Sequence, residues 1–216
     1  MSAAPPYHSR RALLAGLASL AAVPRPAWAA AKPPVITILG DSITAGYGLR
    51  EADALPAQLQ LALARLGVRA TVRGAGVSGD TTAGGLGRVD FSVQPDTALC
   101  IVALGGNDLL QGLDPRASRA NLDAIVRRLK ARRIKVVLCG LEAPRRLNAG
   151  FARAFDAVFA SVARAEGTPL YPNLLAGVEL TPGLNQGDGI HPNARGVKMI
   201  TARLAPVVAR ALRARA

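Results

Sequence analysis

Residues 35–48 read VITILGDSITAGYG, and they carry the clearest indication of the fold. Its first part, residues 35–39, is a short apolar run that stops at Gly40. An uninterrupted apolar run of this length predicts a strand that is buried on both faces, as in a parallel sheet. Asp41 and Ser42 follow at once. Ligands of parallel sheets bind beyond the carboxyl ends of the strands, so we expect a site there.

Similar runs recur along the chain and alternate with helical patterns. Further strands are expected at residues 70–73, 98–104, 134–138 and 169–171, with a glycine-rich loop at 74–87 that grades into a helix. Helices are expected around residues 55–66 and after Ser118, Asn148 and Asn193, each of which could be an N-cap. This alternation predicts an α/β fold: a three-layer α/β/α sandwich with a five-stranded parallel sheet.

The first 29 residues have the composition of an export signal. Arg10 and Arg11 precede an apolar stretch at residues 15–23, and an A-x-A cleavage site follows at 27–29. The paired arginines resemble a twin-arginine signal, and the stretch is too short to span a bilayer comfortably. We expect residues 1–29 to be removed and residues 30–216 to form one periplasmic or secreted domain. A disordered tail or an uncleaved anchor is the alternative.

The formal net charge is +13, while charged residues make up 19% and aromatic residues 4% of the chain. A nucleic-acid site would need basic residues clustered with aromatic ones. Here the arginines are spread over most of the chain, so we expect a solvated basic surface and no nucleic-acid partner. Attraction to an anionic lipid or envelope polymer stays open.

The two cysteines, Cys100 and Cys139, each lie in an apolar run. Buried free thiols are expected, because cysteine behaves as a small core residue, although an oxidising compartment would permit a disulfide. The chain has no CxxC or Cys/His spacing, no P-loop and no dinucleotide fingerprint. It therefore predicts no metal and no cofactor.

Four polar segments stand out, three after predicted strands and one before the last helix. They cover residues 40–48 (GDSITAGYG), 76–81 (GVSGDT), 105–108 (GGND) and 188–192 (DGIHP). The aspartates beside the motifs, Asp41, Asp80 and Asp108, are interpreted as structural.

These segments contain the groups that ester hydrolysis requires. Ser42, at a strand end entering a glycine-bearing turn, can be the nucleophile, and His191 can take its proton. Asp188, three residues earlier, can orient the imidazole ring. The side-chain amide of Asn107 and the backbone N–H groups of Gly79 and Ser42 can donate to an oxyanion. Once residues 1–29 are removed, His191 is the one histidine left.

The set resembles the SGNH (GDSL-type) hydrolase family, and looks most like its thioesterase I, lysophospholipase and arylesterase group, from about residue 35 to 204. The resemblance implies the triad Ser42, Asp188 and His191, and an oxyanion hole of Ser42, Gly79 and Asn107. It also implies a flavodoxin-like fold and hydrolysis of small acyl esters, with thioesters and lysophospholipids as further substrates.

Two departures from the family pattern leave the substrate open. Residues 74–76 read Gly-Ala-Gly where an asparagine is expected, and residues 142–146 form an unusually charged loop. A carbohydrate O-deacetylase with the same residues is one alternative, and a non-catalytic envelope-binding protein is another. Apolar Leu109, Leu110 and Leu147 near the motif loops favour acyl chains. Chain length, head group, leaving group and oligomeric state are not determined by the sequence.

Overall fold

The computed structural model describes residues 1–2, 32–144 and 147–214, and the predicted export signal falls almost wholly outside them. All described helices and strands belong to the unit Pro33–Ala216. Its core is a five-stranded parallel sheet in the order β2-β1-β3-β4-β5. The strands are β1 (Val35–Gly40), β2 (Thr71–Gly76), β3 (Thr97–Ala103), β4 (Lys135–Cys139) and β5 (Leu170–Tyr171).

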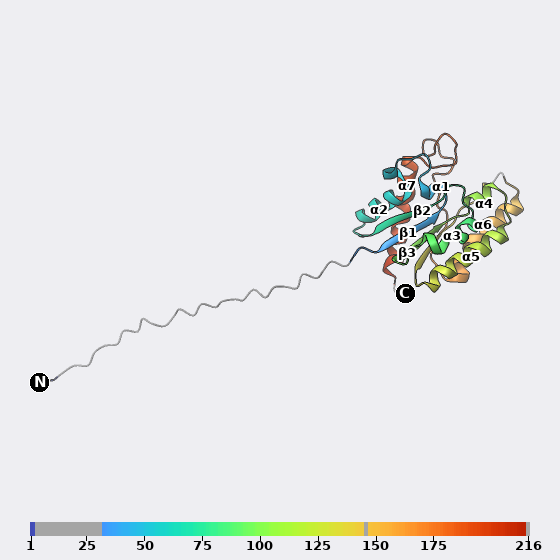
Figure 1. Cartoon of the computed structure of the whole chain (residues 1–216). Coiled ribbons are helices and arrows are strands. Elements are labelled where there is room, and N and C mark those ends of the chain that lie inside the picture. The colour runs from blue at the N-terminus through green and yellow to red at the C-terminus, as the bar shows by residue number, and fades with distance from the viewer. Residues whose placement is uncertain (3–31, 145–146, 215–216) are drawn as a thin grey trace. The chain divides into compact units, whose positions relative to one another are not determined.

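Helices cover both faces of this sheet (Figure 1). One face carries α2 (Leu55–Arg65) and α7 (Ala194–Arg213), and the other carries α3 (Thr82–Ser92), α5 (Pro115–Ala131) and α6 (Ala149–Glu166). Three short helices lie in the connections: α1 (Ser42–Ala45), the 3-10 helix Glu51–Asp53 and α4 (Gly106–Leu110). The predicted three-layer α/β/α sandwich is confirmed.

Burial on both faces explains why the central strands are continuous apolar runs. In β3, Leu99 and Ile101 join the core beneath α2 and α7, while Cys100 and Val102 join the core beneath α3, α5 and α6. β2 lies at the sheet edge and is only half-buried, so its apolar signal is weaker. It extends to Gly76, three residues into the predicted loop.

The cysteines are buried and free, as expected. Cys100 belongs to one core and Cys139 to the other. Because their side chains lie in different layers, the sheet itself separates them.

Two of the three predicted helix caps are confirmed. Asn148 accepts hydrogen bonds from the backbone N–H groups of Gly150 and Phe151, and Asn193 caps α7 in the same way. The Ser118 cap is wrong, because α5 begins at Pro115 and its N-cap is Asp114. Ser118 is buried within the helix, and its hydroxyl donates to Asp108 over 2.8 Å.

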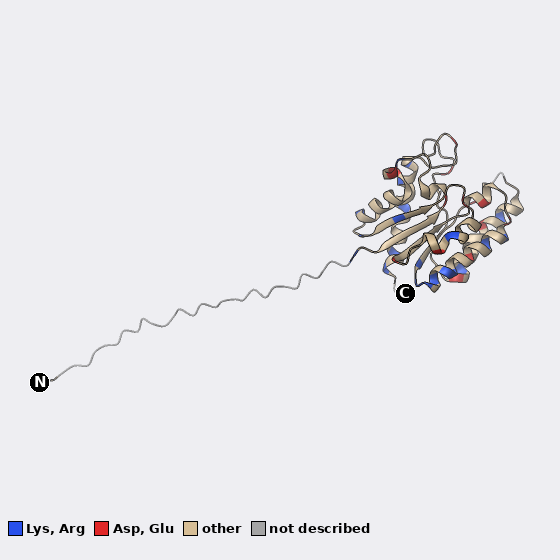
Figure 2. Ribbon diagram, in the orientation of Figure 1, with Lys and Arg blue, Asp and Glu red and all other residues tan. Residues whose placement is uncertain are grey.

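The charged residues follow the helical surface. Figure 2 shows Lys and Arg positions along several helices, interspersed with Asp and Glu positions. Several of these arginines form exposed ion pairs, such as Arg116 with Asp114 and Arg127 with Asp123 and Glu166. Within the described residues, no helix combines the length and the apolar character that crossing a membrane requires.

Candidate active site

Ser42, His191 and Asp188 form a continuous chain of hydrogen bonds. Ser42 is the first residue of α1, directly after β1, while the other two lie in the loop before α7. Ser42 Oγ lies 2.8 Å from His191 Nε2, and His191 Nδ1 lies 2.6 Å from Asp188 Oδ2. In the tautomer that this arrangement favours, Nδ1–H donates to the carboxylate and Nε2 accepts from the serine hydroxyl. The fold thus brings together three predicted residues from opposite ends of the domain.

A one-turn helix presents the serine. Asp41 is its N-cap, and its carboxylate accepts from the backbone N–H of Ile43 over 3.0 Å. The helix ends at Gly46, whose φ of 77° suits a residue without a Cβ atom. Ser42 keeps only 9% of its surface exposed, so its hydroxyl is reached through a defined opening.

Gly76, at the end of β2, lies against the backbone of the turn that carries Ser42. A Cβ atom at this position would lie 2.3 Å from the backbone nitrogen of Ala45 and 2.7 Å from the carbonyl oxygen of Asp41. The end of β2 therefore packs directly against the backbone of the serine turn, and no side chain fits between them.

Asp188 is held in its ionised form by the residues that follow it. Its Oδ1 accepts from the backbone N–H groups of Ile190 (2.9 Å) and His191 (3.0 Å), while Oδ2 faces the imidazole ring. These hydrogen bonds, the His191 backbone first, lower the pKa of Asp188 to about 2. The carboxylate can therefore fix the ring orientation and stabilise an imidazolium at neutral pH.

Two further residues support His191 and were not predicted. The ring of Tyr47 lies on the imidazole, with the ring centroids 4.7 Å apart. Gln186 donates from Nε2 to the carbonyl oxygens of Tyr47 (2.8 Å) and Pro192 (3.1 Å), and its backbone N–H donates to the carbonyl of His191. Tyr47 lies in the same motif as Ser42, but sequence spacing does not reveal a contact with a ring that is 144 positions away.

The three predicted oxyanion donors, Ser42, Gly79 and Asn107, line one cavity together with His191. Gly79 has a φ of 85°, and nothing lies within 4 Å of where its Cβ would be, so its backbone borders open space. Asn107, in α4, donates one side-chain N–H to the carbonyl oxygen of Asp80 over 2.8 Å. An amide nitrogen carries two protons, so the second N–H is available to a ligand.

The carboxyl group of Asp41, the residue before Ser42, is buried, and its pKa is raised. Asp41 is only 5% exposed, and burial raises the pKa of its carboxyl to about 6, against the opposing effects of its backbone hydrogen bonds and of His191. Its contact with the Ile43 N–H fits the structural role predicted for it.

The cavity has a volume of about 350 Å³, within the range of small-molecule sites. Its walls are largely apolar and are formed by Ile43, Leu109, Leu110, Leu141, Leu175, Leu180 and Ile190, with the carboxylate-bearing Glu142 and Glu179 also present. Of the three leucines predicted near the motif loops, Leu109 and Leu110 line this cavity. Leu147 instead packs against the core beneath α3, α5 and α6. Among the described residues, no group of three or more His, Cys, Asp or Glu side chains could hold a metal ion.

Comparison with known proteins gives a consistent result. Residues 38–199 match the model of the GDSL-like Lipase/Acylhydrolase family, a span that includes all five predicted site residues. The chain is 39% identical to "Esterase TesA" of Pseudomonas aeruginosa over 73% of this chain and 79% of the relative. It is 34% identical to "Thioesterase 1/protease 1/lysophospholipase L1" of Escherichia coli, over 76% of this chain and 78% of the relative.

A solved structure agrees with these relatives. The fold matches the crystal structure of AlinE4, an SGNH-hydrolase family esterase, with a TM-score of 0.70 and 44% sequence identity, over 85% of this chain and 98% of AlinE4. The chain therefore belongs to the GDSL-like lipase/acylhydrolase family and is a carboxylic ester hydrolase of that family.

Proposed function

We propose that this enzyme hydrolyses oxyesters and thioesters of apolar acyl chains through an acyl-enzyme on Ser42. The observation that supports this most directly is the hydrogen-bond chain from Ser42 through His191 to Asp188 at an apolar cavity. A serine hydroxyl is a weak nucleophile until a base takes its proton, and this arrangement supplies the base and the group that orients it.

In the acylation step, Ser42 Oγ attacks the acyl carbonyl carbon while its proton moves to His191 Nε2. The carbonyl oxygen becomes an oxyanion, which accepts hydrogen bonds from the backbone N–H groups of Ser42 and Gly79 and from the free side-chain N–H of Asn107. The imidazolium, stabilised by Asp188, then protonates the leaving alcohol or thiol, and the bond to it breaks. Water activated by His191 attacks the acyl-enzyme, releases the acid and restores Ser42.

The cavity supports the acyl specificity. Seven aliphatic side chains line it, so an aliphatic chain loses contact with water on binding at a gain of about 0.8 kcal/mol per buried methylene. One relative is named an esterase and another a thioesterase and lysophospholipase, which supports testing both oxygen and sulfur leaving groups. An O-deacetylase would gain little from such walls.

A p-nitrophenyl ester series from acetate to palmitate tests the proposal. We expect kcat/KM to rise with chain length before it falls, and Ser42→Ala to abolish turnover. The matched control is Ser161→Ala on α6, which removes a hydroxyl bonded to backbone carbonyls far along the chain from every motif and should retain activity. Full turnover by Ser42→Ala would contradict the mechanism, and a preference for acetylated glycan over longer acyl esters would favour the O-deacetylase.

Residues 1–29 are proposed to direct export and to be cleaved, with the domain from residue 30 working in the periplasm or outside the cell. The support is the sequence pattern of paired arginines, apolar stretch and A-x-A site. Expression with N-terminal sequencing of the exported fraction tests it. A processed N-terminus near residue 30 is expected, and retention of the full chain in the cytoplasm would contradict it.

A further inference from the structure

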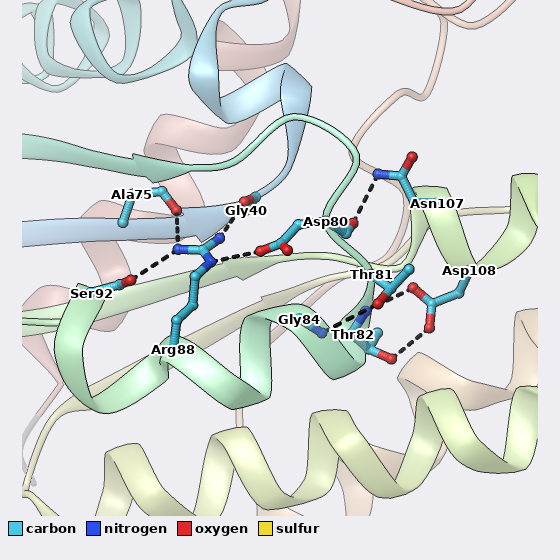
Figure 3. Close-up of polar contacts among 10 residues, drawn as sticks. All are labelled: Gly40, Ala75, Asp80, Thr81, Thr82, Gly84, Arg88, Ser92, Asn107 and Asp108. Atoms are coloured by element: carbon cyan, nitrogen blue, oxygen red, sulfur yellow. Dashed lines mark hydrogen bonds and ion pairs between the residues drawn. The ribbon is translucent and has the colours of Figure 1, made fainter.

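Arg88, in the middle of α3, contacts β1 and β2 near the ends that lead to Ser42 and Gly79. Its Nη2 donates to the carbonyl oxygen of Gly40 over 2.8 Å, and its Nη1 donates to the carbonyl of Ala75 (2.9 Å) and to Ser92 Oγ (3.1 Å). Its Nε donates to Asp80 Oδ2 over 2.6 Å. Figure 3 shows the guanidinium between these acceptors. Arg88 lies outside the four polar segments that the sequence predicts to carry the site.

The acceptors of Arg88 are adjacent to the reacting groups. Gly40 is the last residue of β1, two positions before Ser42, and Ala75 lies in β2, four positions before Gly79. Asp80 directly follows Gly79. One rigid, planar side chain thus ties the serine turn to the loop that carries an oxyanion donor, a geometry that a single ammonium group cannot reproduce.

Asp80 connects Arg88 to the side chain of Asn107. Its carboxylate binds Arg88, while its backbone carbonyl accepts the side-chain N–H of Asn107 over 2.8 Å (Figure 3). That hydrogen bond sets the direction of the amide and leaves its second N–H directed elsewhere. A Cβ atom at Gly84 would lie 2.2 Å from Asp80 Oδ1, so α3 approaches the Asp80 side chain at a position without a side chain.

The α4 segment that carries Asn107 is anchored to the same helix on its other side. Asp108, 1% exposed, accepts from the backbone N–H of Thr82 (2.8 Å), from Thr82 Oγ1 (2.5 Å) and from Ser118 Oγ (2.8 Å). Thr82, the first residue of α3, therefore holds the backbone beside Asn107. Arg88, six positions later in α3, binds Asp80, whose carbonyl accepts from the Asn107 side chain. α3 is the common platform for both.

We propose that Arg88 is a positioning residue for the oxyanion hole, acting through Asp80 on the Asn107 amide. The inference rests on the proposed function, because it needs Asn107 to stabilise an oxyanion. Arg88 and Asp80 are both partly buried, with 19% and 14% of their side chains exposed, so water replaces their contacts poorly. Removing the guanidinium leaves the Asp80 carboxylate uncompensated and frees the loop to shift. Displacements of about 1 Å cost enzymes about 100-fold in rate.

Arg88→Gln and Arg88→Lys test the proposal in the full chain with p-nitrophenyl butyrate. We expect kcat to fall about 10- to 100-fold with KM changed less than about threefold, because the restrained groups act in the transition state. Lysine should not rescue, since it reaches one acceptor as a point charge. Inactivation by diethyl p-nitrophenyl phosphate should slow by the same factor, because the phosphoryl oxygen occupies the same hole. The pH profile should keep its acid limb, because His191 and Asp188 are untouched.

The matched control is Arg73→Gln. Arg73 lies on the same strand as Ala75 and forms a two-bond ion pair with Asp96, but that pair is exposed and bonds to no motif residue. This variant should keep wild-type kcat. A double variant separates positioning from general destabilisation. If Arg88 acts through Asn107, then Arg88→Gln added to Asn107→Ala should cost much less than the product of the two single effects.

Two outcomes would overturn the inference: Arg88→Gln with kcat within twofold of wild type, or multiplicative losses in the double variant. Should the arginine variants not fold, Asp80→Asn retains the Arg88 guanidinium and its bonds to the Gly40 and Ala75 carbonyls, and weakens only the restraint on the Asp80 segment. It should still lower kcat about tenfold at constant KM, and wild-type kcat there would overturn the proposal. Wild-type inactivity on all esters, or activity in Ser42→Ala, would instead refute the proposed function.

Discussion

Replacing Asp188 with asparagine tests the catalytic role proposed for this residue, because asparagine keeps the shape of the side chain and removes its charge. In the wild-type enzyme one carboxylate oxygen accepts from two backbone N–H groups, those of Ile190 and His191, and the other accepts from His191 Nδ1. An amide offers a single acceptor oxygen. It cannot serve both sides at once.

Two orientations of the new amide are available. With its oxygen toward the backbone N–H groups, the NH₂ group faces His191 Nδ1 and favours the tautomer with the proton on Nε2, which cannot accept the Ser42 proton. With its oxygen toward Nδ1, the tautomer is correct, but two backbone donors lose their acceptor. At about 1–1.5 kcal/mol for each lost bond, the competent orientation is disfavoured by about 2–3 kcal/mol.

This preference corresponds to a loss of about 30- to 160-fold in the competent population, at 1.36 kcal/mol for each factor of ten. The missing charge beside the imidazolium costs a further factor of about 13–160, as expected for a charge-assisted hydrogen bond worth about 1.5–3 kcal/mol. We therefore expect kcat for Asp188→Asn to be about 400- to 25,000-fold below wild type.

The assay is steady-state hydrolysis of p-nitrophenyl butyrate, combined with ¹⁵N-histidine NMR to detect the tautomer of His191. The control is Asp114→Asn, which alters a carboxylate that also accepts from a backbone N–H and pairs with Arg116, but at the exposed start of α5. It should leave kcat unchanged. A kcat within tenfold of wild type for Asp188→Asn, or an Nδ1–H tautomer in that variant, would refute the reasoning.

Three further predictions follow from burial and ring packing. Burial raises the pKa of Asp41 from 3.8 to about 6, so the folded enzyme binds this proton more tightly than the unfolded chain, and the wild-type enzyme loses stability as the pH rises between these two values. The Tm of Asp41→Asn relative to wild type should therefore increase between pH 4 and pH 7. A constant Tm difference would argue against this assignment. Tyr47→Ala removes the aromatic ring that packs against the His191 imidazole and should lower kcat about 2- to 10-fold, since aromatic pairs contribute about 0.5–1.5 kcal/mol. Tyr47→Phe keeps the ring and should retain activity. Equal losses in both variants would assign the effect to the hydroxyl group. Burial raises the pKa of the Cys100 and Cys139 thiols to about 12, so the native enzyme should not react with Ellman's reagent at pH 8 while the urea-unfolded chain yields two thiols, and a reactive native thiol would contradict the burial.

Much of the fold can be predicted because its determinants are local in sequence. The strands at residues 35–39 and 98–104 are apolar on both faces, which is what a central parallel strand requires. The caps at Asn148 and Asn193 bond backbone groups two or three positions away, so the same few residues specify both partners. Ser118 shows where this reasoning fails: a capping residue type was used instead as a long-range partner of Asp108.

The candidate site also has features that are local in sequence and features that are not. Ser42, Gly79, Asn107, Asp188 and His191 could be named from the sequence because short motifs carry them and because residue chemistry limits their roles. The Asp188 loop is also local, with every acceptor within three positions of its donor. These parts depend on contiguous segments, which is why they can be predicted without knowledge of the fold.

The contacts between distant segments depend on how the elements pack, and the sequence does not predict them. The 2.8 Å contact between Ser42 and His191 joins residues 149 positions apart and depends on strand order and on the packing of α7. Arg88 is one arginine among many in the sequence, and its four acceptors become neighbours only when β1, β2 and α3 are assembled. A sequence pattern specifies which face of a helix or strand is buried. A hydrogen bond requires its two atoms to be placed within tenths of an ångström, and the packing of the elements against one another sets those positions.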